Sequence, residues 1–444
     1  MKALTFLAGI VVSVNVGLFA QTLSLEQARE LALSNSRSLA RYNLAVQDNL
    51  LNERIQRYQD IPSFSLSASA STDLWTSDGI PQDLTRDSLR AGVGFSVSQR
   101  LWNGGKSAIL RAINSLGTEM SRQDALAEYY AVLNSADTHY YAVLETAAAL
   151  EAAESSLETA VLSLAMAEVR HISGMVSEAV YLQALAEMAG RETSRNQSRR
   201  DLALARLRLR ELLGLDVIPS LQPVDFDSQE DLILLLSVAD ESGIDRLFEA
   251  LWKQTHSRNP SMVRAALGSQ RAERNVSLGS RDYSPTLNAS LSTGLNLYNN
   301  LGPQGGRLSL SANIPINFWE TASNVERRRI ARDQAALDYR SALNSLDIEL
   351  HTLVLDLVSQ AGQILSSRRA LDYALKHFEH VLELYRLSRN TPSELSDAET
   401  LVRNNRNQLN RSQYAFLTGL SRIRSVGVFE SDEEIIRLIS SVLE

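Results

Sequence analysis

The sequence of 444 residues predicts an α+β membrane protein in which each chain contributes four transmembrane β-strands and long antiparallel coiled-coil helical hairpins, arranged in two structural repeats. Three observations support this fold class. Four segments alternate apolar and polar residues with period two. Two stretches, 107–171 and 321–387, each hold a single Gly and no Pro. The order of these parts also occurs twice along the chain, which indicates an internal repeat.

The composition excludes several classes of protein. With 44 basic against 52 acidic residues the net charge is −8, so the chain lacks the basic surface typical of nucleic-acid binding. It contains no cysteine, which excludes disulfides, cysteine-ligated zinc and a thiol nucleophile. No catalytic motif stands out, so we predict no enzymatic activity, no metal and no cofactor. His377 and His380 lack clustered carboxylates at ligand spacing, and we interpret them as a solvated or interfacial pair.

Residues 1–20 have the features of a secretory signal peptide. Lys2 is followed by an apolar run that ends at Ala20, a small residue before a polar chain. We predict export and cleavage after Ala20. No window after residue 20 approaches the ~18 apolar residues of a membrane-spanning helix, so contact with a membrane has to use another structure.

The internal repeat divides the rest of the chain into corresponding halves. Asn35 corresponds to Asn259 at an offset of 224, and Ala184 corresponds to Ala398 at an offset of 214. The region between the halves carries two prolines and an acidic stretch, which are typical of a surface connector. We therefore expect a first repeat at 21–215, a connector at 216–243, a second repeat at 244–427 and a C-terminal segment at 428–444.

The alternating segments predict β-strands at 63–75, 88–101, 286–298 and 307–318. One face of each is apolar and free of charge, and each is at least as long as the ~9–11 residues that a tilted strand needs to cross a membrane. Aromatic residues near the strand ends predict a girdle at the two membrane interfaces, formed by Phe64, Trp75, Trp102, Tyr298 and Trp319.

Four strands cannot close into a barrel, because lipid tolerates no open sheet edge and the smallest spanning barrels have ~8 strands. The chain therefore has to share a barrel with other copies. Two copies would supply eight strands and three would supply twelve, and the strand count does not choose between them. A soluble sandwich with one wet face is the alternative for the strands alone.

The two stretches without Pro predict helices of roughly 98 Å, at ~1.5 Å per residue. Both carry a seven-residue apolar repeat, which indicates coiled-coil packing. Each helix turns back sharply. The first tip, near 172–177, has Gly174 for a left-handed C′ position and Ser177 for the next N-cap. The second, near 388–392, has the sequence of a capping box that starts at Thr391.

Three motifs, in their order along the chain, resemble the TolC-like outer-membrane efflux protein family, the outer membrane factors. They are an opening helix, a strand-to-helix junction and a hairpin tip: Leu23-Ser-Leu-Glu-Gln-Ala-Arg-Glu-Leu-Ala-Leu-Ser-Asn35, Ser98-Gln-Arg-Leu-Trp-Asn-Gly-Gly-Lys106 and Gly174-Met-Val-Ser-Glu-Ala-Val-Tyr-Leu-Gln-Ala-Leu-Ala-Glu187. Arg100 stands where the junction usually has Pro. The resemblance covers essentially the whole mature chain.

The resemblance implies a homotrimer with a twelve-stranded β-barrel in outer-membrane lipid and a periplasmic α-helical tunnel. It also implies two partners, a periplasmic adaptor (membrane fusion) protein and an inner-membrane transporter. Adaptor contacts are expected at the hairpin tips, from Ile172, Gly174, Met175, Val176, Ser177, Arg389, Asn390 and Thr391. Because acidic rings narrow the periplasmic entrance in this family, the candidates for a pore constriction are Asp372, Glu379 and Glu383.

The sequence therefore predicts a passive exit duct of a tripartite efflux or type I secretion system. The alternative is a soluble or peripheral periplasmic coiled-coil scaffold or tether. That alternative explains the heptads but not four alternating segments bounded by Trp and Tyr. An uptake porin would need many more strands per chain and no periplasmic hairpins.

Overall fold

The computed structural model of the chain describes residues 22–72, 89–226, 229–297, 302–387 and 389–443. The elements of the first half are α1 (Leu25–Asn35), α2 (Arg37–Tyr58), β1 (Ser63–Thr72), β2 (Leu89–Trp102), α3 (Lys106–Ile172) and α4 (Glu178–Leu213). Those of the second half are α5 (Glu230–Ser237), α6 (Glu241–Thr255), α7 (Pro260–Ser280), η2 (Arg281–Tyr283), β3 (Thr286–Asn296), β4 (Gly302–Asn313), α8 (Phe318–Arg386), α9 (Pro392–Gly427) and α10 (Asp432–Leu443).

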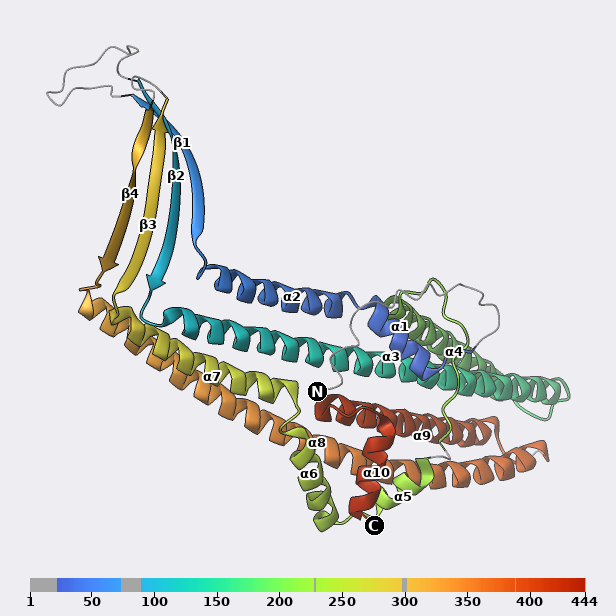
Figure 1. Cartoon of the computed structure of the whole chain (residues 1–444). Coiled ribbons are helices and arrows are strands. Elements are labelled where there is room, and N and C mark those ends of the chain that lie inside the picture. Colours follow the sequence, from blue (N-terminus) through green and yellow to red (C-terminus); the bar gives the residue numbers. More distant parts are fainter. Residues whose placement is uncertain (1–21, 73–88, 227–228, 298–301, 388, 444) are drawn as a thin grey trace.

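The molecule is elongated, with the sheet at one end (Figure 1). Helices α2, α3, α7 and α8 run side by side away from the sheet, and α4 and α9 pack on the far halves of α3 and α8. Helices α5, α6 and α10 lie across the middle. Within the described ranges, no helix combines the length and the apolar character that crossing a membrane requires.

Local capping chemistry sets where the helices begin. Ser24 and Gln27 form a capping box before α1, and Ser36 both ends α1 and caps α2. In the second half Asn259 caps α7, whose first residue is Pro260. Each half therefore opens with a helix that is broken and restarted before it reaches the sheet.

The two long helices agree with the expectation from the sequence. Helix α3 has 67 residues and α8 has 69, and each is followed by a returning helix of 36 residues. The heptad positions Leu350, Leu357 and Ile364 of α8 are fully buried. The predicted fold class, mostly helical with four antiparallel strands in two halves, is confirmed.

The fourth strand differs from its prediction at both ends. We expected it at 307–318, but β4 begins at Gly302 and ends at Asn313. Pro315 has no N–H to donate, and the chain passes directly into α8 at Phe318. The register between β3 and β4 shifts between Ser292 and Gly294. Beyond this shift, the glycine-rich start of β4 continues to pair with β3, and Gly302 pairs with Asn296.

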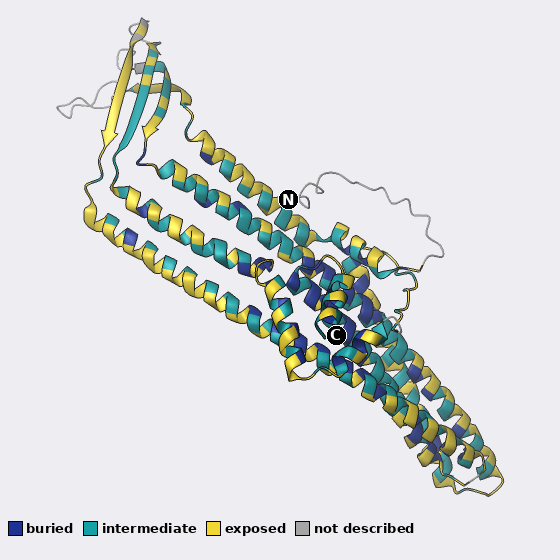
Figure 2. Cartoon of the chain, turned by 60° about the horizontal axis from the view of Figure 1, so that its bottom comes forward, coloured by how far each residue is buried: buried dark blue, intermediate teal, exposed yellow. Residues whose placement is uncertain are grey.

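Buried residues concentrate where helices from both halves cross (Figure 2). The segment 216–243, which we expected to be a surface connector, contributes to this core. Its helix α5 buries Leu232, Ile233 and Leu236 almost completely. The connector prediction is therefore wrong for α5, since its apolar side packs against α8 and α10.

Candidate functional site

The sheet separates a polar face from an apolar face. Its register joins four serines into one row across all the strands: Ser63, Ser98, Ser290 and Ser309. The hydroxyl oxygens lie 2.7 Å apart between Ser63 and Ser98, and also between Ser290 and Ser309. The neighbouring row lies on the opposite face because side chains alternate along a strand, and it consists of Phe64, Val97, Leu291 and Leu308.

The structure places three of the five predicted girdle aromatics. Phe64 on β1 and Trp102 at the end of β2 are 68% and 46% exposed. Trp75 and Tyr298 lie outside the described residues. Trp319 is 75% exposed but belongs to the first turn of α8, so the expectation that it ends a strand is wrong. The ladder stops before Pro315, and the helix has begun by this position.

A β-bulge explains how Trp102 reaches the apolar face. Arg100 pairs with Asn288, whereas Trp102 pairs with Leu287, so Leu101 is an extra residue in β2. By strict alternation Trp102 would lie on the same face as Arg100. The bulge instead puts it in register with the apolar row.

The sheet has two open edges. Its strand order is β1-β2-β3-β4, so in the described sheet β1 and β4 are each paired on one side only. Unpaired backbone groups of this kind are costly in lipid. One copy of the chain therefore cannot form a complete membrane-spanning structure.

The first hairpin tip is a tight turn around Gly174, which has φ +72°. The N–H groups of Gly174 and Met175 donate to the carbonyls of His171 and Arg170 at 2.9 and 2.8 Å, the two hydrogen bonds of a Schellman motif. Ser177 occupies the N-cap of α4, but its side chain makes no capping hydrogen bond. The backbone, and not that hydroxyl, shapes this tip.

The second tip is held by side chains. Thr391 Oγ1 accepts a hydrogen bond from the Glu394 N–H at 3.3 Å, and the Glu394 carboxylate accepts one from the Thr391 N–H at 2.8 Å. The predicted capping box is present. Residue 388 lies outside the described residues.

The two tips differ in their exposed chemistry, and the hairpins touch just behind them. Ile172 and Met175 of the first tip are 80% and 74% exposed, whereas the second presents Arg389. Arg170 of α3 donates to the Tyr385 carbonyl at 2.6 Å, and its guanidinium lies 4.6 Å from the centre of that ring. The predicted tip residues are thus brought to one end of the molecule (Figure 1).

The three candidate constriction acids lie along one side of α8. Asp372, Glu379 and Glu383 are exposed, and Asp372 pairs with Lys376 at 2.7 Å. Arg368, one turn earlier, pairs with Glu230 of α5 at 2.6 Å. The acidic row therefore starts beside α5, and its role in a pore constriction stays a prediction.

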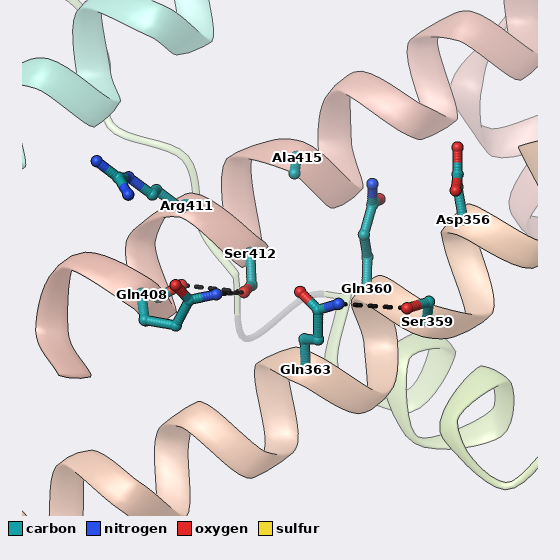
Figure 3. A pocket seen from close by; sticks show the side chains of 8 residues that line it. All are labelled: Asp356, Ser359, Gln360, Gln363, Gln408, Arg411, Ser412 and Ala415. Atoms are coloured by element: carbon teal, nitrogen blue, oxygen red, sulfur yellow. Dashed lines mark hydrogen bonds between the residues drawn. The ribbon is translucent and has the colours of Figure 1, made fainter. Parts of the chain in front are cut away.

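A polar groove of about 210 Å³ lies between α8 and α9 (Figure 3). Gln363 donates to Ser359 at 3.2 Å, and the side-chain oxygen of Gln360 has no hydrogen-bond partner. Arg411 also lines a second groove, against α3 and α4, where it lies 3.8 Å from Glu145. Neither groove pairs a nucleophile with a base. In the part of the chain that the structure describes, no three potential metal ligands come together.

A buried charge cluster joins the two halves, and the sequence analysis missed it. Asp137 of α3 accepts hydrogen bonds from Arg29 of α1 at 2.6 and 2.9 Å, and from Arg424 of α9 at 2.6 Å. Asp432 of α10 pairs with both arginines, at 2.8 and 3.1 Å. Burial lowers the pKa of Arg29, but the two carboxylates outweigh it and raise that pKa above its usual value. Four helices are thus tied together at one point.

Comparisons with known proteins agree with this architecture. The model of the outer membrane efflux protein family matches residues 28–215 and 251–426. The solved structure of CusC, a protein that forms a transmembrane channel, is 18% identical over 91% of both chains, with a TM-score of 0.76. The Campylobacter jejuni outer membrane channel CmeC is 17% identical over 95% of this chain and 90% of its own, with a TM-score of 0.75.

The Vibrio cholerae outer membrane protein VceC is 16% identical over 91% of this chain and 96% of its own, with a TM-score of 0.72. No curated protein sequence matches the chain. At these identities the solved structures show the fold, and the family model covers most of the sequence. The resemblance inferred from three motifs is thereby confirmed: the chain belongs to the outer membrane efflux protein family, and its location is the outer membrane.

Proposed function

We propose that three copies of the chain form the exit duct of a tripartite efflux or type I secretion system. The duct conducts cargo passively from an inner-membrane transporter and its adaptor across the periplasm and the outer membrane. The observation that carries this proposal is the four-stranded sheet with two open edges. Three copies supply twelve strands, and lateral pairing of β1 with β4 of a neighbour removes every edge.

The helical layer has matching free sides. Helices α2 and α8 are its outermost members, because α3 and α7 lie between them. Apolar side chains that are at least half exposed recur at seven-residue spacing on both helices: Leu44, Leu51 and Tyr58 on α2, and Ile330 and Leu337 on α8. Burying these two stripes against each other between copies extends the same association from the sheet into the helices.

The assembly is testable on the purified mature chain. In detergent the purified protein should have three times the mass of one chain, and in planar bilayers it should produce ion conductance. In cells the chain should fractionate with the outer membrane. A water-soluble monomer that leaves bilayers silent would overturn the duct and would favour the scaffold.

The hairpin tips are the proposed contact with the periplasmic adaptor. They lie at the end of the molecule opposite the sheet, and the first presents Ile172 and Met175 to solvent. The chain has no cysteine, so a single Met175→Cys substitution gives one reactive site. We expect it to crosslink to the adaptor in cells. Val238→Cys is the control, because Val238 is 81% exposed but lies beside α5 in the middle of the molecule. Equal crosslinking at both positions would contradict the tip assignment.

The proposed entrance constriction is a finer point. Three copies would repeat the row Asp372, Glu379 and Glu383 three times and would favour cations at the periplasmic entrance. Charge reversal by Glu379→Lys should then reduce the cation preference of single channels. Unchanged ion selectivity in this variant would remove Glu379 from the constriction.

A further inference from the structure

Along the described strands, the polar face of the sheet carries positive charge and no negative charge. Arg100 and Arg307 lie on this face, and the described strands contain no Asp or Glu. The apolar face of an outer-membrane strand contacts lipid, so the polar face borders the lumen of the barrel. The described part of the lumen lining is therefore basic, although the chain as a whole has a net charge of −8.

The two arginines flank the serine row. Arg100 lies in the row of Asn288 and Ser311, which follows the serine row on the side nearer the helices. Arg307 lies in the next row on the other side, in register with Ser292. The levels of the two arginines are thus four residues apart along the strands, about 14 Å at ~3.4 Å per residue. Hydroxyl groups fill the level between them.

Neither Arg100 nor Arg307 has an acidic partner among the described residues, and both are exposed. Three basic residues just below the sheet do have acidic partners. Lys106 and Arg328 both pair with Asp282, at 2.8 and 3.5 Å, and Arg111 pairs with Asp60. Arg100 and Arg307 therefore carry guanidinium groups on the strands that are available to a ligand.

We infer that the barrel lumen contains an anion-binding collar, formed by Arg100, Arg307 and the serine row between them, which takes cargo that bears phosphate or carboxylate groups. The collar rests on the proposed trimeric duct. Three copies set three Arg100 and three Arg307 side chains around one lumen, with twelve serine hydroxyls between the two levels.

The chemistry of the collar suits transient binding. A guanidinium group offers a planar pair of N–H donors that matches phosphate and carboxylate oxygens, and serine hydroxyls add further donors. Water in the lumen weakens each contact. An anion can therefore pass from one arginine level to the other without being trapped, as conduction requires.

The test is block of single-channel current by inorganic triphosphate, added to the barrel side of the trimer in planar bilayers. Block from that side reports on the lumen of the barrel, whatever charge lies at the periplasmic entrance. The double variant Arg100→Gln/Arg307→Gln is compared with wild type and with Arg437→Gln. Arg437 is the matched control, because its side chain is 81% exposed on α10, far from the sheet.

We expect the half-blocking concentration of triphosphate to rise about tenfold in the double variant and to stay unchanged in Arg437→Gln. In wild type, block should weaken in 1 M salt, where charges are screened within about 3 Å. If the double variant does not assemble, the two single variants each test one level, and each should raise the half-blocking concentration by about threefold.

Two outcomes contradict the collar in different ways. Channels that conduct but are blocked equally in wild type and in the arginine variants would overturn the collar and leave the duct intact. A wild-type protein that forms no channels at all would overturn the duct and, with it, the collar.

Discussion

The two repeats share their helices and strands but differ in chemistry at corresponding positions. The offset of 214 that relates Ala184 to Ala398 also relates Asp137 of α3 to His351 of α8. Asp137 is fully buried between two arginines, whereas His351 is partly exposed and stacks on Phe248, with ring centroids 3.5 Å apart. A repeated backbone thus does not require a repeated charge.

Where the backbone itself needs a partner, the repeats agree. The Asn35 side-chain amide donates to the Leu213 carbonyl at 2.7 Å, and the Asn259 amide donates to the Val426 carbonyl at 2.9 Å. Both asparagines tie a helix break to the end of the returning helix. This hydrogen bond to the backbone is therefore preserved between the halves, whereas the charge of Asp137 is not.

Among substitutions at positions where the repeats differ, replacement of the buried Asp137 should have the largest effect on stability. Asp137→Ala removes the fully buried carboxylate that Arg29 and Arg424 share and leaves them only the partly exposed Asp432, which we expect to cost about 3 kcal/mol. The measurement is the thermal midpoint of unfolding in detergent at fixed protein concentration. Asp372→Ala, which removes an exposed ion pair with Lys376, should leave that midpoint nearly unchanged. Equal shifts in the two variants would contradict the special role of burial.

The paired asparagines allow a direct comparison between the repeats. Asn259 caps α7, is 7% exposed and also bonds Val426, so Asn259→Ala should cost about 2 kcal/mol. Asn35 is exposed and caps no helix, so Asn35→Ala should cost about 1 kcal/mol. The urea midpoints of unfolding of both variants give the ratio of the two losses in stability. A larger loss for Asn35 would reverse this ranking.

Tyr140 tests a polar position that is apolar in the other repeat. Its hydroxyl oxygen lies 2.9 and 2.8 Å from the carbonyls of Leu23 and Gln222, and the corresponding residue of α8 is the buried Val354. Burial raises the pKa of Tyr140 to about 12. Tyr140→Phe should cost about 1 kcal/mol at neutral pH.

The sign of the pH effect follows from the raised pKa. The unfolded chain loses this proton near pH 10 and the folded chain only near pH 12, so stability falls as the pH rises through this range. Thermal midpoints between pH 9 and 12 should decline less steeply in Tyr140→Phe than in wild type. Parallel declines would show that Tyr140 contributes nothing to the alkaline loss.

The smallest effect concerns the ends of the returning helices. Gly214 and Val428 are related by the same offset, and both are left-handed, at φ +65° and +57°. A β-branched residue is strained there, so Val428→Gly should stabilise the protein by about 0.5–1 kcal/mol. Gly214→Ala should destabilise it, because the added Cβ would lie 2.9 Å from the Asn35 side chain. If both substitutions shift the thermal midpoint of unfolding in the same direction, the left-handed conformation at these two positions would be contradicted.

The sequence predicts the long helices and the strands because their signals are local. Few glycines and prolines interrupt α3 and α8, and period-two alternation identifies all four strands. The end of β4 was misplaced, since alternation continues past Asn313 into a segment that Pro315 keeps out of the ladder. The apolar run of α5 from Leu232 to Leu236 is a usable signal for a buried helix, but the two prolines that precede it in the connector obscured that signal.

The charge cluster could not be predicted from local pattern. Arg29 lies 108 positions from Asp137, and Arg424 lies 287 positions from it. Each of these residues alone is typical of an exposed helix face. The unpaired state of Arg100 and Arg307 was equally hidden, because it depends on which strands are neighbours and on the register between them.

The open edges of β1 and β4 also constrain how the protein is made. A lone copy that entered the bilayer would expose two rows of unsatisfied amide and carbonyl groups to hydrocarbon. For the proposed trimer, insertion into lipid and association with other copies therefore have to occur together, and a single chain has to stay outside the lipid until then. Biogenesis of the mature protein should accordingly depend more steeply than linearly on the amount of exported chain.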